Sequence, residues 1–337
     1  MGYPLPRMLD LARMDRIQLS AAPRAQRFVA CVLLMPNYNL LPGIRIDFEG
    51  PLPREPVIYA MNHTDRFNYW PFQYRMWRKH ARFTATWVKG KNYEHPLTAR
   101  FMELTNNIPI VSRGYLITRD FISMVGRRPS DAEYSALRRA VDPGASNGNG
   151  AALRGVVPAE VLDRARDLFG YRFDPEREPY PRAMDGVFRE MMRRFVDLNQ
   201  HALDLGLDLL VFPQGTRSIR LSRGHGGLGQ IALHLKRPIV PVGCNGNDRL
   251  YPGKAPFARR GRVVYRFGEP IAHQDLAAFH PPEPFVPFTS EAEEAHGERF
   301  QGVVDLVMER VNDLLDERHR WSDDREGEGT RGTARFV

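Results

Sequence analysis

Short apolar runs alternate with helical stretches along most of the chain. The helical stretches include residues 69–79 and residues 96–104, the latter with a proline in its first turn. Six apolar runs have the length and the β-branched or aromatic content of strands, namely residues 57–61, 83–88, 108–111, 207–212, 238–242 and 263–267. This rhythm predicts an α/β fold, with a single mixed or largely parallel sheet flanked by helices.

The two ends of the chain differ from this pattern. Residues 24–41 predict a helix whose apolar positions are too dense for a simple water-facing surface, and we expect it to lie at a membrane interface. A proline-rich connector leads to an amphipathic helix over about residues 290–320, and residues 322–337 predict a frayed tail. The expected organisation is an N-terminal interfacial region over 1–50, a main domain over 51–275, and a C-terminal helix and tail over 276–337.

One long segment interrupts the main domain. Residues 119–200 contain polar helices around the run Asp-Pro-Gly-Ala-Ser-Asn-Gly-Asn-Gly at 142–150. Turn-forming and flexible residues of this kind fix no single backbone path. We therefore expect a flexible insertion within the main domain.

The composition excludes several classes of protein. Of 337 residues, 42% are hydrophobic and 26% charged, which is enough for one large core or two modest ones and excludes a disordered or fibrous chain. No apolar run approaches the ~20 residues of a membrane-spanning helix, and the N-terminus lacks the pattern of a secretory signal. Cys31 and Cys244 lie far apart, which argues against a disulfide scaffold or a cysteine-rich metal site. We expect a cytoplasmic protein.

The net charge of +8 is concentrated in one stretch. Between residues 75 and 100 the only acid is Glu94, and the basic residues are Arg75, Arg78, Lys79, Arg82, Lys89, Lys91 and Arg100. Together with interleaved aromatic residues, this stretch suits nucleic acid, anionic lipid or a phosphorylated substrate, and a solvated face over core aromatics is the alternative. No helix-turn-helix, RNP or zinc pattern supports nucleic acid, so we expect an anionic membrane surface as partner and no nucleic acid.

A histidine stands directly after the first predicted strand, in the run Asn62-His63-Thr64-Asp65-Arg66-Phe67-Asn68. A turn from a buried strand into a helix lies at the carboxyl edge of the sheet, where α/β proteins build their sites. A histidine accepts a proton near neutral pH, and a polar partner on its other ring nitrogen fixes the tautomer. A structural role is the alternative for a lone histidine at this place.

A second motif follows the strand at residues 207–212, which ends in Pro-Gln-Gly. Gly215 permits a tight backbone turn. Thr216, Arg217 and Ser218 then offer the donor types that bind phosphate oxygens. An ordinary strand-to-loop turn is the alternative for this motif alone.

Two further strand ends complete a set of four motifs. Arg113 stands just beyond the third predicted strand, and the run Ile-Val-Pro-Val-Gly at 239–243 has a proline within a strand, which requires an edge, a bulge or a bend. In order and kind, the four motifs resemble the four sequence blocks of the glycerolipid acyltransferase family. The run Phe-Pro-Gln-Gly-Thr-Arg-Ser at 212–218 differs from the family's third block at one residue, and Gly-Glu-Pro-Ile at 268–271 is similar to a run that follows the fourth block. The resemblance covers roughly residues 57–271, less the insertion.

The resemblance implies an O-acyltransferase of phospholipid biosynthesis. His63 matches the family's general base, which acts on the hydroxyl of a lysophospholipid such as 1-acylglycerol-3-phosphate, so that this hydroxyl attacks the thioester of acyl-CoA or acyl-carrier protein. Because the attack is direct, no metal, cofactor or covalent enzyme intermediate is expected. The positions matched to the acceptor's binding site are Arg113, Gln214, Gly215, Thr216 and Arg217. A family member would associate peripherally with the inner face of a membrane.

Two residues depart from the family pattern, both from carboxylate to amide. Asn68 stands at the position of the family's aspartate, and Gln214 at the position of its glutamate. An asparagine still accepts a hydrogen bond from the imidazole but carries no charge to favour the imidazolium, and the corresponding change in a serine-protease triad lowers turnover by about four orders of magnitude. Asp65 is the alternative carboxylate, provided that a non-helical turn brings it to His63. The rival function is an impaired family member that binds phospholipid without turnover.

Overall fold

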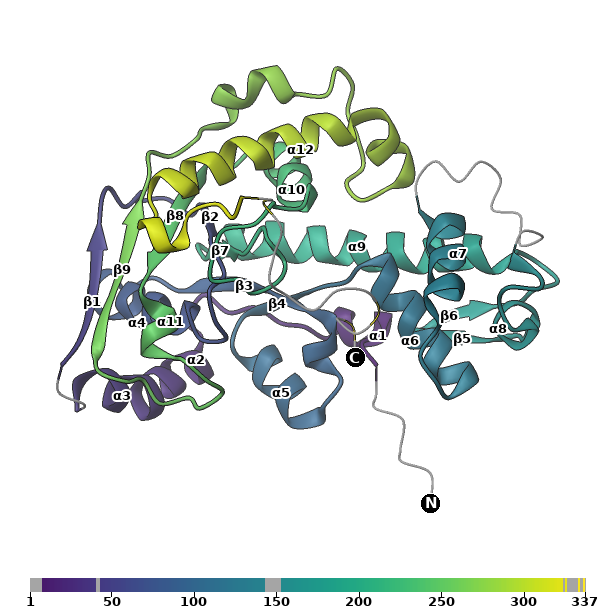
Figure 1. Ribbon diagram of the computed structural model, residues 1–337, viewed down its shortest axis with the longest axis horizontal. Coiled ribbons are helices and arrows are strands. Elements are labelled where there is room, and N and C mark those ends of the chain that lie inside the picture. Colours follow the sequence, from purple (N-terminus) through teal and green to yellow (C-terminus); the bar gives the residue numbers. More distant parts are fainter. Residues whose placement is uncertain are drawn as a thin grey trace.

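The computed structural model describes residues 8–40, 43–142 and 153–323, together with residues 325, 333 and 336. A seven-stranded sheet with the order β1-β9-β8-β2-β7-β3-β4 forms its centre (Figure 1). The strands from β8 to β4 run parallel to one another, whereas β9 is antiparallel to β8 and parallel to β1. The strands are β1 (Ile44–Glu49), β2 (Ile58–Met61), β3 (Thr84–Lys89), β4 (Asn107–Ile110), β7 (Asp208–Val211), β8 (Ile239–Asn245) and β9 (Gly261–Phe267). The predicted fold class, α/β with a mixed and mostly parallel sheet, is confirmed.

Helices cover both faces of this sheet (Figure 1). On one face lie α9 (Tyr180–Asp204), α10 (Gly227–Leu235) and α12 (Ser290–Asp313), and on the other lie α2 (Arg24–Val29), α3 (Met35–Asn39) and α4 (Tyr69–His80). The other helices are α1 (Leu11–Asp15), α5 (Pro96–Leu104), α6 (Arg113–Val125), α7 (Asp131–Val141), α8 (Ala159–Asp163) and α11 (Asn247–Leu250). A π-helical turn (Ala30–Leu34) joins α2 to α3, and β5 (Arg166–Leu168) pairs with β6 (Tyr171–Phe173) in a separate hairpin.

Successive residues of the central strands point into two separate cores. Ile58 and Ala60 of β2 pack into the core under α9, α10 and α12, whereas Tyr59 and Met61 pack into the core under α2, α3 and α4. All four residues are buried, and so is the whole of β7. A strand covered on both faces is apolar at nearly every position, which explains the apolar runs in the sequence; the exception in β7 is Asp208, its first residue. Polar side chains are consequently gathered at the strand ends.

The six predicted strands are confirmed, but β1 was not among the predicted strands. This strand alternates isoleucine and phenylalanine with charged residues and lies at the edge of the sheet, where one side pairs only with β9. Pro241 lies in β8, which is an interior strand, just before the residues of β8 that pair with β9 from Val242 onward. The missing N–H of the proline therefore interrupts no paired step with β9.

The segments outside the sheet are helical over much of their described length. Residues 24–39 form α2, the π-helical turn and α3 in succession, and α12 ends at Asp313, short of the predicted residue 320. Most of the flexible run predicted at 142–150 and of the tail predicted at 322–337 lies outside the described residues. Within the described ranges, no helix is long and apolar enough to cross a membrane.

A buried ion pair ties together segments at the amino ends of the strands. Asp208, the first residue of β7, is fully buried, and its carboxylate accepts hydrogen bonds from the guanidinium of Arg82 and from the backbone N–H of Val57 (3.1 Å). Arg82 also donates to the carbonyl oxygen of Glu55 (3.0 Å). Burial raises the pKa of Asp208 to about 6, although Arg82 and the N–H of Val57 act in the opposite direction. Removing the guanidinium of Arg82 would therefore leave the carboxylate of Asp208 buried and uncompensated, which is strongly destabilising.

Candidate functional site

The carboxyl ends of three neighbouring strands, β2, β7 and β3, carry the polar residues of two motifs. His63 follows β2, Gln214 and Arg217 follow β7, and Lys89 is the last residue of β3. Parallel neighbouring strands bring their carboxyl ends to one edge of the sheet. The candidate site is this edge.

The imidazole of His63 is fixed by Asn68, a fully buried residue. Nδ1 of His63 lies 3.0 Å from Oδ1 of Asn68, and Nδ2 of Asn68 donates to the carbonyl oxygen of Asn62 (2.8 Å). The second bond orients the amide with its oxygen toward the ring, so Nδ1 carries the proton and Nε2 is left as a proton acceptor. The ring of Phe212 stacks on the imidazole, with 4.4 Å between ring centroids.

The loop after β7 holds the peptide of His63 on both sides. The backbone N–H of His63 donates to Oε1 of Gln214 (2.9 Å), and the carbonyl oxygen of His63 accepts from the N–H of Ser218 (2.8 Å). Gln214 is buried, and its Nε2 donates to the hydroxyl of Ser222 (3.0 Å). An amide suits this position because it accepts at one atom and donates at the other. Gln214, which the resemblance assigned to acceptor binding, is engaged in positioning His63.

The turn that follows brings two polar residues to the surface. Gly215 has φ of +64°, a left-handed conformation that favours glycine, and a Cβ there would lie 3.0 Å from Cδ2 of His225. Thr216 is partly exposed and Arg217 is exposed. Within the described ranges, Arg217 has no ion-pair partner. Its guanidinium is accordingly available to an anion.

The surroundings of His63 keep its imidazole neutral. Burial lowers the pKa of His63 to about 3, the positive charges of Arg217 and Lys89 act in the same direction, and the hydrogen bond to Asn68 opposes them. No carboxylate of the described residues lies within hydrogen-bonding distance of the ring. The edge thus combines a neutral base with the exposed guanidinium of Arg217, an arrangement that favours an anionic ligand.

Asp65 is held by groups other than the histidine. Its Oδ2 accepts from the hydroxyl of Thr64 and from Nδ2 of Asn247, both at 2.8 Å, and its Oδ1 accepts from the N–H of Phe67 (2.8 Å). Burial raises the pKa of Asp65, and these three hydrogen bonds oppose that shift. Of the two partners considered for His63, the structure brings Asn68 to the imidazole and holds Asp65 against the start of α11.

The side chain of Asn62 anchors the start of the loop over residues 62–68 to the neighbouring strand β8. Its Oδ1 accepts from the N–H of Cys244 (2.7 Å), and its Nδ2 donates to the carbonyl oxygen of the same residue (3.0 Å). The side chain therefore extends the pairing between β2 and β8 by one step. The hydroxyl of Tyr265 donates to the carbonyl oxygen of Asn68 (2.6 Å) and fixes the other end of the loop.

Arg113, which the resemblance assigned to acceptor binding, is buried in an ion-pair cluster. Its guanidinium lies 2.8 Å from Oε2 of Glu293 on α12 and 3.2 Å from Oδ1 of Asp185 on α9. The ring of Phe188 covers its face, with 4.1 Å from Cζ to the ring centroid. These contacts join α6, α9 and α12 and favour a structural role for Arg113.

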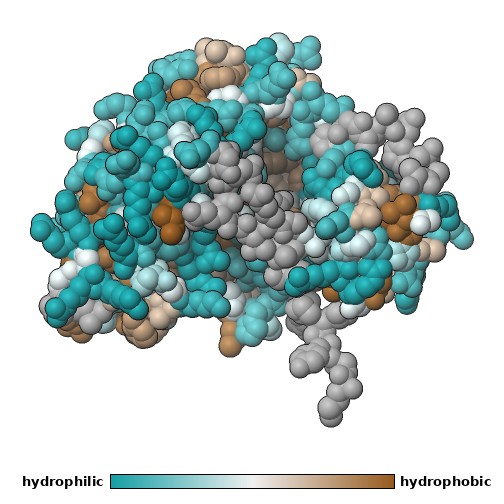
Figure 2. All heavy atoms as spheres, in the orientation of Figure 1, coloured by the Kyte–Doolittle hydropathy of each residue, from teal (hydrophilic) through white to brown (hydrophobic). Residues whose placement is uncertain are grey.

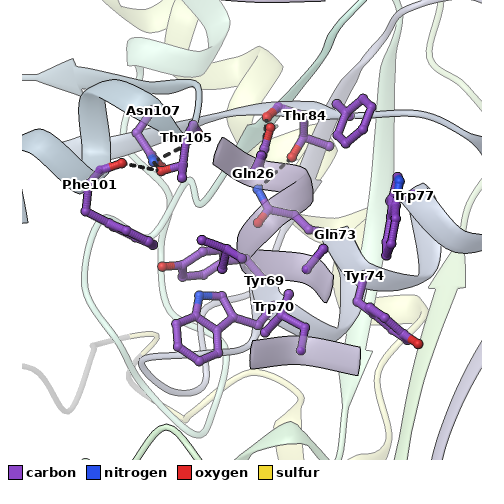
Figure 3. Close-up of a pocket in the computed structure, with 14 residues that line it drawn as sticks. Gln26, Tyr69, Trp70, Gln73, Tyr74, Trp77, Thr84, Phe101, Thr105 and Asn107 are labelled. Carbon is purple, nitrogen blue, oxygen red and sulfur yellow. Dashed lines mark hydrogen bonds between the residues drawn. The ribbon is translucent and has the colours of Figure 1, made fainter. Parts of the chain in front are cut away.

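A pocket lies between α4, the segment from α2 to the π-helical turn, and α5 (Figure 3). Aromatic rings line much of it, and Gln73 donates to the hydroxyl of Thr84 (2.8 Å) in its wall (Figure 3). The ring of Tyr69 connects the pocket to the site, because it lies 6.5 Å from the ring of Phe212 between centroids. The lining residues are Gln26, Val29, Ala30, Leu34, Tyr69, Trp70, Gln73, Tyr74, Trp77, Phe83, Thr84, Phe101, Thr105 and Asn107.

Two residues of the site were not singled out by sequence reasoning. Lys89 was considered only as part of a basic surface, and Phe212 only as the end of a strand and the first residue of the run at 212–218, with no role in the site. The signal for Lys89 is its position at the end of a predicted strand, which could have placed it at the carboxyl edge. In the described part of the chain, no three His, Cys, Asp or Glu side chains are arranged to hold a metal ion.

No protein-family model and no curated protein matches this chain. Among solved structures, the chain is similar to the crystal structure of the 1-acyl-sn-glycerophosphate (LPA) acyltransferase, PlsC, from Thermotoga maritima, with 15% sequence identity and a TM-score of 0.40. The match covers 93% of this chain and 88% of that chain. At this level the similarity does not by itself identify an activity.

Proposed function

We propose that the protein is an O-acyltransferase that moves a fatty acyl group from acyl-CoA or acyl-carrier protein to the hydroxyl of a lysophospholipid, with His63 as general base. The observation that carries this proposal is the 3.0 Å contact between Nδ1 of His63 and Oδ1 of Asn68, which leaves Nε2 as acceptor at the carboxyl edge. The order of the four motifs favours acyl transfer among the reactions that a histidine base serves.

In the proposed mechanism, Nε2 of His63 takes the proton of the acceptor's hydroxyl while the hydroxyl oxygen attacks the carbonyl carbon of the thioester. The proton on Nδ1 stays with the histidine and keeps the ring oriented toward Asn68. The carbon–sulfur bond then breaks, and the leaving thiolate takes the proton from the imidazolium. The products are the acylated lipid and a free thiol.

The binding groups follow from the surroundings of the base. We assign the acceptor's phosphate to Arg217, which is exposed at this edge and whose charge acts on the imidazole.

An exposed apolar face suits binding to a membrane surface. Its residues in the segment from α2 to α3 are Phe28, Val32, Met35 and Leu40, and α5 adds Leu97 and Leu104. Figure 2 shows apolar spheres among hydrophilic ones along the lower edge of the molecule, where Figure 1 labels α2, α3 and α5. Arg24 and Arg27 are exposed on the same segment. We propose peripheral and partly electrostatic attachment to the anionic inner face of a membrane.

A phospholipid-binding protein without turnover is the second candidate function. The observation that favours it is a pair of amides: Asn68 contacts the imidazole of His63, and Gln214 accepts from the backbone N–H of His63. The experiment that separates the two candidates mixes purified protein with acyl-CoA or acylated carrier protein and a panel of lysophospholipids, and follows thiol release. Saturable thiol release that requires the acceptor supports acyl transfer. Lysophospholipid binding without thiol release from either donor assigns the binding function instead.

Arg217→Ala is expected to raise the KM for the lysophospholipid by about tenfold and to change the KM for the donor little, because one charge-assisted contact to phosphate is lost. Steady-state kinetics with the acceptor varied measures this change. Arg182→Ala removes an exposed arginine from α9 and is the matched control, with unchanged kinetics. An unaltered response of Arg217→Ala to acceptor concentration contradicts the assignment.

Replacing Phe28 and Val32 together with serine is expected to lower cosedimentation with anionic vesicles severalfold, because two exposed apolar side chains no longer enter the interface. Cosedimentation of the wild type is expected to fall as salt is raised. Val286→Ser, which changes an exposed valine before α12, serves as the control. Equal sedimentation of the double variant and this control would exclude the segment as the attachment site.

A further inference from the structure

A buried histidine from the C-terminal part of the chain lies against the loop after β7. Beyond α12 the chain forms a short 3₁₀ turn, Glu317–His319, and the side chain of His319 is only 2% exposed. Full burial is uncommon for a side chain with two polar ring nitrogens, both of which then need partners. His319 stands outside residues 57–271, to which the family resemblance is limited, and the mechanism proposed above gives it no part.

Both ring nitrogens of His319 have partners in neighbouring loops. Nδ1 lies 2.9 Å from the carbonyl oxygen of Ile219 and donates to it, because a carbonyl oxygen only accepts. Nε2 lies 3.3 Å from the backbone nitrogen of Gly246, which donates to it in the neutral ring, and 3.4 Å from Oδ1 of Asp248, with which it pairs when the ring is protonated. The other oxygen of Asp248 accepts from Arg318 (2.8 Å). In either protonation state, the ring therefore joins the loop after β7 to the turn from β8 into α11.

The backbone around His319 adds to this contact. The N–H of Leu221 donates to the carbonyl oxygen of His319 (2.9 Å), and the carbonyl oxygen of Leu221 accepts from the N–H of Ser322 (3.3 Å). The guanidinium of Arg220 donates to the carbonyl oxygen of Trp321 (2.8 Å). The segment after α12 thus binds three successive residues of the loop after β7.

The residues bound in this way lie between the two groups that hold the peptide of His63. Ser218, immediately before them, donates its N–H to the carbonyl oxygen of His63 (2.8 Å). Ser222, immediately after them, accepts from Nε2 of Gln214, whose Oε1 accepts from the N–H of His63 (2.9 Å). A shift of this loop therefore displaces both hydrogen bonds to His63 at once, and a displacement of about 1 Å is enough to cost a reaction up to a hundredfold in rate.

The second contact of His319 reaches the same base from another side. Asn247 stands between the two residues that Nε2 of His319 meets, and its Nδ2 donates to Oδ2 of Asp65 (2.8 Å). Asp65 and His63 belong to one loop, residues 62–68. The ring of His319 consequently binds both of the segments that hold this loop.

We infer that His319 is a positioning residue of the candidate site: its buried imidazole fixes the loop after β7 in the place from which Gln214 and Ser218 hold the base, His63. The inference rests on the proposed function and deepens it, because it adds to the site a residue from beyond α12. His319 does not meet the substrate and acts through the two segments that it joins. A loosened loop would let water reach the ring of His63, and burial is the main cause of the lowered pKa of His63.

Three substitutions separate the two contacts of the ring. His319→Leu removes both. His319→Asn keeps an amide N–H at the position of Nδ1 and so keeps the contact with Ile219, whereas His319→Gln places its amide at the position of Nε2 and keeps only the contact with Gly246. Val303→Ala, in the buried face of α12, is the control for packing, since it destabilises the protein without removing a hydrogen bond. Urea denaturation of all four variants shows that each is folded under the conditions of the assay.

The kinetic test measures kcat and KM from thiol release, with 1-acylglycerol-3-phosphate in neutral detergent micelles. His319→Leu and His319→Gln are expected to lower kcat about tenfold and to change the KM for the acceptor less than about twofold, since the base is misplaced and the acceptor's binding groups remain. His319→Asn is expected to restore kcat to within about threefold of the wild type. Val303→Ala is expected to keep the kcat of the wild type.

A second test needs no activity. The NMR signal of the ring of His63, assigned with His63→Ala, is followed as a function of pH. In the wild type it is expected to remain that of a neutral ring down to about pH 5, because the pKa of His63 is about 3. In His319→Leu it is expected to titrate closer to pH 6.5, because water then reaches the ring. The positive charges that act on this ring, those of Arg217 and Lys89, are the same in both proteins.

The outcomes separate this inference from the function on which it rests. A titration of His63 that His319→Leu leaves unchanged overturns the inference, and so does a loss of kcat that is equal in His319→Asn and His319→Leu. A loss of kcat in Val303→Ala that matches its loss of stability assigns the effect to general destabilisation and also overturns it. Absence of thiol release from the wild type with both donors removes the proposed acyl transfer, and the titration then decides by itself whether His319 positions His63.

Discussion

Replacing His63 with alanine is expected to lower acyl transfer by about 10²- to 10⁴-fold, the range that a positioned general base contributes. The loss should appear in kcat, since the residue acts on the proton that moves and does not bind the acceptor's phosphate. His201→Ala changes an exposed histidine on α9 and is the control. Cosedimentation with vesicles should stay unchanged in both variants. Turnover retained by His63→Ala would remove the assignment of the base.

The pH dependence of the wild type follows from the same residue. With a pKa of about 3 in the free protein, His63 is already neutral at pH 5 and above. The base must be neutral to act, so kcat/KM is expected to be level on the acid side down to about pH 5 and to fall only toward the pKa. A fall in kcat/KM that begins near pH 6.5 as the pH is lowered would indicate that the base titrates like a histidine in an ordinary aqueous environment.

Replacing Arg82 with alanine is expected to lower the free energy of unfolding by about 3–5 kcal/mol, because it leaves the fully buried carboxylate of Asp208 without its charged partner. The N–H of Val57 then remains its hydrogen-bond donor. Urea denaturation at neutral pH measures the change. Lys79→Ala removes an exposed positive charge nearby and is expected to change the same free energy by less than about 1 kcal/mol.

The destabilisation caused by Arg82→Ala should depend on pH in a defined direction. The folded protein holds the proton of Asp208 more tightly than the unfolded chain does, since burial raises the pKa to about 6. Wild-type stability contributed by this group therefore falls as the pH rises from about 4 through 6. Without Arg82 the pKa rises further, so the difference between variant and wild type should be larger at pH 8 than at pH 5. An equal difference at both pH values would mean that the guanidinium stabilises the fold by packing and not by its charge.

The sheet could be predicted because its central strands are covered on both faces. Burial on both faces makes β2, and β7 after Asp208, continuous apolar runs that stand out from polar surroundings. The edge strand β1 was missed because only continuous apolar runs were counted as strands, although its alternation of apolar and charged residues is itself the pattern of a half-buried strand. The helix at 290–313 was predicted from its apolar face, but its end at Asp313 depends on tertiary contacts that the pattern of apolar residues does not contain.

From the sequence, only those residues of the candidate site that directly follow a predicted strand could be identified. His63 and Arg217 each follow an apolar run, and parallel strands bring such ends together. Whether Asn68 or Asp65 meets the imidazole depends on Asn247, which is 182 residues from Asp65 and holds its carboxylate. Arg113 likewise finds its carboxylates 72 and 180 residues further along the chain. Pairings over such separations are set by the fold and have no local signature.

The pairing of β1 with β9 constrains how the chain assembles during synthesis. Ile44 lies opposite Gly261, so the first strand of the sheet has no partner until a segment near residue 267 of 337 has left the ribosome. Until then the preceding segment from α2 to α3, which packs beside β1, α4 and the loop at Tyr251, lacks part of its support. Contacts between residues this distant in sequence form slowly. The N-terminal segment is therefore completed only after β9 has been made, and a chain interrupted before β9 would leave the apolar residues of this segment exposed to chaperones.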